Sequence, residues 1–230
     1  MTRGAAQLIF DLPHRPALGA EDFLVSTSNA AAAAIVERWP DWPHPALMVV
    51  APPSAGKTHL ANVWRVRSKA SRLTARTLPE ADVASATGAL LVEDLQEGIA
   101  DERVLFHLLN LVREHRLSML LTSTLAPGEL KVALPDLRSR LRALPVATIA
   151  APDPALLRAV LVKQFADRQL AVEPHVVAYI ALHMEQSMAA AAAVVAEIDR
   201  RALAEHRRVS RALAAEVLAG EGRAPGESAG

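Results

Sequence analysis

The chain has 230 residues but contains no cysteine and one tyrosine, and its charges cancel at 25 basic and 25 acidic side chains. Without cysteine there is no disulfide, thiolate zinc site or cysteine nucleophile, which fits a reducing compartment. Balanced charge argues against a globally basic nucleic-acid-binding coat and against an acidic solvating tail. No uncharged apolar run reaches about 18 residues, and the N-terminus lacks a signal-peptide pattern. We therefore expect a cytoplasmic protein that no helix anchors in a membrane.

Hydrophobic residues make up 51% of the chain, enough for a packed core. Short apolar runs predict parallel strands at residues 46–51, 72–78, 89–92, 117–122 and 146–149. Helical spacing separates these runs, at residues 30–39, 58–68, 101–116 and 134–144. This alternation predicts an α/β fold, with a parallel sheet between two layers of helices. Beyond it the pattern is only helical, at residues 155–169, 173–184, 187–205 and 210–218.

These patterns divide the chain into four parts. We expect a flexible leader at 1–20, an α/β nucleotide-binding subdomain at 21–151, a small all-helical subdomain at 152–219 and a disordered tail at 220–230.

The segment Ala51–Thr58 matches the phosphate-binding loop pattern, except that Ala51 stands where glycine is usual. A predicted strand precedes it and a predicted helix follows it, so its backbone amides can cradle phosphates. Lys57 would then bridge the outer phosphates, and the Thr58 hydroxyl would hold magnesium. The alternative is an ordinary strand-turn-helix with a chance Gly-Lys-Thr. We favour a nucleotide site formed by Pro53, Ser54, Ala55, Gly56, Lys57, Thr58 and His59.

Two acids, Glu93 and Asp94, end the apolar run at 89–92. Carboxylates beside a phosphate loop hold magnesium and orient water in enzymes of this type. We expect Glu93 on the metal side, together with Thr58, and Asp94 on the water side. Glu93 is one methylene longer than the aspartate usual there. Alternatively, Asp94 only caps a turn.

Two further candidates come later in the chain. Thr124 follows a predicted strand, where its hydroxyl either approaches the terminal phosphate or caps the strand end. Arg140 is either a solvated surface charge or an arginine finger that reaches the nucleotide of a neighbouring subunit.

The leader contains an apolar hexapeptide, Gln7–Leu12. Exposed Leu8, Phe10 and Leu12 would be buried in the pocket of a partner, giving a contact of micromolar strength. The alternative is that the leader folds back as an edge strand, and composition alone favours this alternative.

In their order and spacing, these motifs resemble the AAA+ family, specifically the nucleotide-binding module of the bacterial replication initiator DnaA, over residues 23–218. Three stretches resemble the Hda (HdaA) regulators of that family: the hexapeptide, Trp39–Pro43 and Leu134–Arg140. The resemblance implies ADP or ATP with magnesium as cofactor. It makes Thr124 the first sensor, Arg140 the arginine finger, and Gln7, Leu8, Phe10 and Leu12 the residues that bind the sliding clamp, the beta subunit of DNA polymerase III.

The resemblance further implies a negative regulator of DNA replication initiation. Bound to the DNA-loaded clamp, it would promote hydrolysis of DnaA-bound ATP through Arg140. A homodimer of the chain is compatible with this role. Direct reading of duplex DNA is not expected, because the DNA-binding domain that follows in DnaA has no counterpart in this sequence. The lid helix of the family carries a second sensor arginine, whereas Gln186–Ala190 holds no basic residue. Whether the chain hydrolyses ATP itself stays open, and the rival function is an independent ATPase such as a helicase loader or remodeller.

Overall fold

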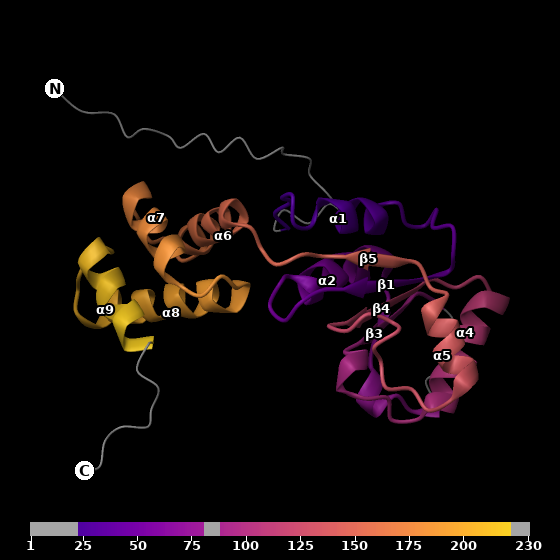
Figure 1. Ribbon diagram of the computed structural model, residues 1–230. Coiled ribbons are helices and arrows are strands. Elements are labelled where there is room, and N and C mark those ends of the chain that lie inside the picture. Colours follow the sequence, from indigo (N-terminus) through magenta and orange to yellow (C-terminus); the bar gives the residue numbers. More distant parts are fainter. Residues whose placement is uncertain (1–22, 81–87, 222–230) are drawn as a thin grey trace, which may run out of the picture. The chain divides into compact units, whose positions relative to one another are not determined.

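The computed structural model describes residues 23–80 and 88–221. The chain divides into two compact units, with the boundary after Ala151 (Figure 1), and each is described by itself. The predicted clamp-binding residues Gln7, Leu8, Phe10 and Leu12 lie outside the described residues, as does the tail from residue 222.

The first unit is built on a five-stranded parallel sheet in the order β2-β3-β4-β1-β5. Its strands are β1 (Ala46–Val50), β2 (Ser71–Thr74), β3 (Leu90–Glu93), β4 (Met119–Ser123) and β5 (Val146–Thr148). Each predicted strand is confirmed, although β2 is shorter than expected because a 3-10 turn, η1 (Ala75–Thr77), follows it. Since all strands are parallel, their carboxyl ends meet at one edge of the sheet, where the predicted site residues follow.

Helices cover both faces of this sheet. Helices α1 (Ala30–Glu37) and α2 (Lys57–Ser68) pack on the face that contains Leu47, Leu91 and Leu120. On the opposite face, α4 (Glu102–Glu114) and α5 (Pro135–Arg142) bury their apolar sides against Met48, Val92 and Leu121. Successive strand residues alternate between the two faces, so one sheet supplies both cores. The predicted three-layer α/β/α arrangement is confirmed.

Three tryptophans fix helix α2 in place. Trp64 of α2 is fully buried, stacks on Trp42 at a ring distance of 5.4 Å and meets the Trp39 ring edge-on. The Trp39 indole donates a hydrogen bond to the Ser118 hydroxyl, next to β4. These contacts anchor the helix that follows the phosphate loop and so position the loop itself.

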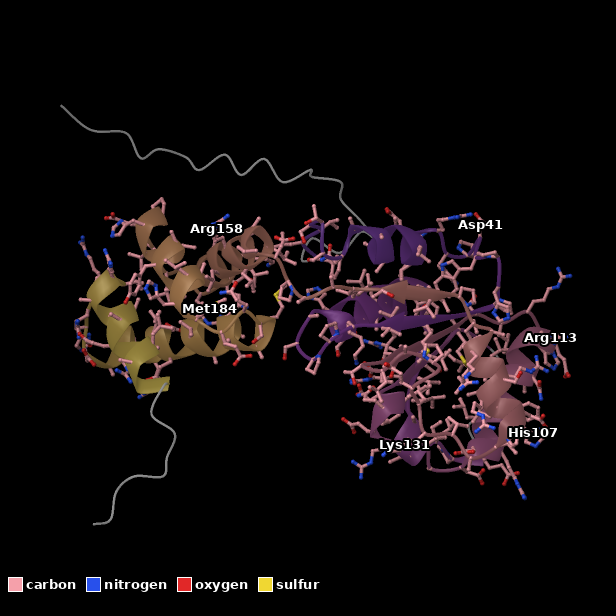
Figure 2. All side chains as sticks on the ribbon, viewed as in Figure 1. Asp41, His107, Arg113, Lys131, Arg158 and Met184 are labelled. Carbon is pink, nitrogen blue, oxygen red and sulfur yellow. The ribbon has the colours of Figure 1, made fainter. Side chains whose placement is uncertain are left out.

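The second unit contains only helices: α6 (Pro154–Asp167), α7 (Pro174–His183), α8 (Met188–Ala204) and α9 (Arg211–Glu221). They share a core that includes Phe165, Ile198 and Met184, the last labelled among the helices in Figure 2. The prediction that the tail begins at residue 220 was wrong, because α9 continues through Glu221. Gly220 costs a helix only about 1 kcal/mol relative to alanine, which does not end it. Across residues 23–80 and 88–221, no helix is long and apolar enough to cross a bilayer.

Candidate nucleotide-binding site

The phosphate loop connects the end of β1 to the start of α2. Gly56, the N-cap of α2, has a φ of 95°, which a glycine adopts without strain. The backbone of Ser54 also lies in the left-handed region, with a φ of 55°, whereas the backbone of Ala51 does not. Ala51 is buried in the apolar core under α2, and its amide donates to the Ser123 carbonyl. The unusual alanine is therefore accommodated: its backbone needs no glycine, and its methyl group packs in the core.

The backbone at the start of α2 is suited to binding an anion. Its first amides have no acceptor within the helix, and no acidic side chain lies in the first turn. Pro53, Ser54, Thr58 and His59 are exposed there, and the His59 ring packs edge-on against Phe23 at 5.4 Å. Ala55 is buried and belongs to the core packed under α2.

Lys57 is paired with one of the two candidate acids. Its ammonium lies 3.0 Å from an Asp94 carboxylate oxygen, and the side chains are 9% and 34% exposed. The backbone of Asp94 lies in the left-handed region, with a φ of 62°. Burial raises the pKa of Asp94, but hydrogen bonds from Gln96 and Lys57, with the charges of Lys57 and Arg72, lower it below the ordinary value. Asp94 is therefore ionised at neutral pH and holds the lysine that a phosphate would need.

A polar network links Asp94 to strand β4. The Gln96 amide donates to the Asp94 carboxylate at 3.1 Å, and its carbonyl accepts from the Thr124 backbone amide at 3.0 Å. The Thr122 hydroxyl, fully buried, accepts from the Asp94 backbone amide at 3.1 Å. Thr124 thus enters the network through its backbone. Gln96 and Thr122 were not among the predicted site residues. Only Thr122 had a signal in the sequence, because the period of two along an extended chain puts residues 122 and 124 on one face.

The other acid, Glu93, is directed elsewhere. Its buried carboxylate accepts a hydrogen bond from Arg72 of the neighbouring strand β2 and forms an ion pair with it. A magnesium ion on Glu93 and Thr58 would have to displace this guanidinium. The residues present therefore do not fit a metal in this arrangement.

Arg140, the predicted finger, lies on α5 and is half-exposed. Its guanidinium carbon sits 5.8 Å from the centre of the Phe106 ring on α4. Among the described residues no carboxylate pairs with it, unlike Arg200 and Arg201, which both bind Glu197. The start of α8, which holds no basic residue at 186–190, is capped by the Ser187 hydroxyl.

The fold is similar to that of several DnaA structures. It superposes on domain III of the Thermotoga maritima replication initiation protein DnaA with a TM-score of 0.75 and 18% identity, covering 86% of this chain and 94% of that one. AMPPCP-bound DnaA from Aquifex aeolicus gives a TM-score of 0.68 at 19% identity, over 80% of this chain and 65% of that one. The Thermotoga maritima RuvB Holliday junction branch migration motor gives a TM-score of 0.64 at 16% identity, covering 83% of this chain and 65% of that one.

No family model and no curated protein matches the sequence. At such identities the likeness shows the fold alone, and the predicted α/β fold with a helical subdomain is confirmed.

Proposed function

We propose that this chain is an adenine-nucleotide-binding regulator of the Hda kind. It binds ADP or ATP at Pro53–His59 and, when bound to the DNA-loaded sliding clamp through Gln7, Leu8, Phe10 and Leu12, promotes hydrolysis of DnaA-bound ATP. The result is negative regulation of replication initiation. The DnaA-like fold supports the nucleotide site, and two of the similar DnaA structures hold AMPPCP.

One observation carries the choice of function: Arg140 rests on an aromatic ring instead of a carboxylate. Phe106 is partly buried and Arg140 is half-exposed, and a cation over a ring near the surface is held by about 0.5–1 kcal/mol. Little is therefore lost when the guanidinium leaves the ring for a phosphate of another molecule. An arginine entering a neighbouring site in this way stabilises the charge on the transferred phosphoryl group.

The chain's own site supports a role on a partner's nucleotide. Lys57 is held by Asp94, and Glu93 is held by Arg72. Groups that would orient water and neutralise phosphate are thus engaged with each other, so we expect slow hydrolysis by the chain alone.

The decisive experiment follows ATP pre-bound to DnaA in a single turnover, with and without the protein and with and without clamp loaded on DNA. We expect acceleration that requires the loaded clamp. Because an arginine finger contributes about 10³–10⁵ in rate, Arg140→Ala should abolish the acceleration. Arg138→Ala, an exposed arginine on the same helix, is the matched control and should retain it.

The leader is tested separately. Replacing Gln7 and Phe10 with alanine should remove clamp binding while nucleotide binding stays unchanged. No acceleration of DnaA, together with fast ATP turnover by the chain alone, would instead identify an independent ATPase such as a helicase loader or remodeller. The similarity in fold to the RuvB branch migration motor supports this alternative.

A further inference from the structure

Both acids at the end of β3 already have a basic partner. Arg72 binds Glu93, and Lys57 binds Asp94. The two carboxylates and the two cations cancel, so this cluster is neutral before any metal or nucleotide arrives. Phosphate-loop sites ordinarily leave such carboxylates to a divalent cation.

Strand register puts Glu93 on the side of the sheet that carries the phosphate loop. Arg72 of β2 is opposite Leu91 of β3, and Glu93 lies two residues beyond Leu91, on the same face. Leu91 belongs to the core packed under α2, the helix that begins at Lys57. Glu93 is also adjacent in sequence to Asp94, whose carboxylate contacts Lys57. The Arg72–Glu93 pair is therefore part of the phosphate-binding side of the molecule.

The two members of this pair differ in exposure. The Glu93 side chain is 4% exposed and that of Arg72 is 62% exposed. A buried carboxylate without a partner is strongly unfavourable, and it would also repel a phosphate bound nearby. The guanidinium reaches in from the edge strand and removes both problems. At other phosphate sites a divalent cation neutralises the carboxylate in this way.

We propose that Arg72 stands in for the divalent cation as the counter-charge of Glu93, so that this site binds a nucleoside di- or triphosphate with little dependence on magnesium. The proposal rests on the nucleotide site of the proposed function. It concerns the metal requirement for binding and makes no use of Arg140.

The test is the affinity of the purified full chain for ADP, measured calorimetrically with excess magnesium and again with EDTA. For the unaltered chain we expect the two dissociation constants to agree within about threefold. Arg72→Gln should weaken binding in EDTA by about tenfold or more, because it uncovers Glu93 near the phosphates. Magnesium should restore this loss by taking the place of the guanidinium.

Arg76→Gln is the matched control. Arg76 is 64% exposed and lies 3.8 Å from Glu97, so it resembles Arg72 in exposure and in having an acidic partner, but that partner is itself 50% exposed. This variant should bind ADP as the unaltered chain does in both buffers.

A double variant, Arg72→Gln with Glu93→Gln, guards against misfolding of the single variant. It removes both charges, so it should fold and bind ADP without magnesium. Three results would overturn the role of Arg72 alone. They are an ADP affinity that depends tenfold or more on magnesium in the unaltered chain, the same dependence in the double variant, and an equal dependence in Arg72→Gln and Arg76→Gln. Failure of the unaltered chain to bind ADP in either buffer would overturn the nucleotide site as well.

Discussion

Replacing Asp94 with asparagine separates the two consequences of its ion pair with Lys57. The change preserves shape, and asparagine is among the residues that best tolerate the left-handed backbone found here, at a φ of 62°. The amide oxygen can still accept the hydrogen bond from Gln96. What is lost is the negative charge 3.0 Å from the Lys57 ammonium.

The structure sets the size of the effect on stability. Breaking a buried ion pair costs about 3–5 kcal/mol, and an exposed pair contributes about 0–1 kcal/mol. The Lys57 side chain is 9% exposed, but Asp94 is 34% exposed, which places this pair between the two limits. We expect a loss of about 1–2 kcal/mol, or roughly 2–8 °C in Tm for a chain of this size.

The same change should strengthen nucleotide binding. Lys57 would no longer have to leave a carboxylate to reach a phosphate, so the affinity for ADP should rise about five- to tenfold. The assay pairs thermal unfolding without nucleotide with calorimetric titration of ADP. Asp101→Asn is the control, because asparagine also caps helices and Asp101 caps α4. A simultaneous fall in stability and in ADP affinity would refute the competition between Asp94 and phosphate.

Three further changes probe other parts of the molecule. Phe106→Leu removes the ring that Arg140 must leave, so the stimulated hydrolysis on DnaA should stay the same or rise by no more than about two- to fivefold, without altered clamp binding; a slower single-turnover rate would contradict a resting contact that is given up when Arg140 acts. Phe165→Ala should destabilise the helical unit by about 3–5 kcal/mol in urea unfolding, since Phe165 is fully buried. Hydrogen bonds from Arg200 and Arg201 lower the pKa of Glu197 from its ordinary 4.5 to about 2. Their stabilising contribution is therefore present above pH 4.5 and lost as the pH falls toward 2, and Glu197→Gln should flatten that part of an acid-unfolding profile.

The sequence reveals those site residues that stand in contiguous motifs. The loop at Ala51–Thr58 and the acids Glu93 and Asp94 are visible because each directly follows a short apolar run. The strands themselves are predictable for the same reason, since fully buried parallel strands are nearly all apolar. The early end of β2 was not predictable, because Leu78 is as buried after the 3-10 turn as a strand residue would be.

The partners of those acids are not predictable from the chain alone. Arg72 meets Glu93 only because β2 and β3 are neighbours, and strand order is a property of the folded sheet. Gln96 is one polar residue after an acidic pair, and nothing in its local sequence indicates that its side chain spans to Thr124. The left-handed backbone of Asp94 turns its carboxylate toward Lys57, a direction that side-chain alternation along an ideal strand would not give.

The neutral cluster and the available arginine are linked in the proposed mechanism. Hydrolysis in a phosphate-loop site needs an acid that can orient water and a cation that can stabilise the developing charge. In this chain Asp94 holds Lys57, and Arg72 holds Glu93.

Arg140, resting on Phe106, is the candidate catalytic group that can be lent to another molecule at little cost. Asp94→Asn should therefore leave the stimulation of DnaA within about twofold of normal while Arg140→Ala abolishes it. The single-turnover assay on clamp-loaded DNA measures both variants side by side. Loss of stimulation in Asp94→Asn, with clamp binding intact, would contradict this argument, because it would mean that the chain's own acid takes part in the reaction.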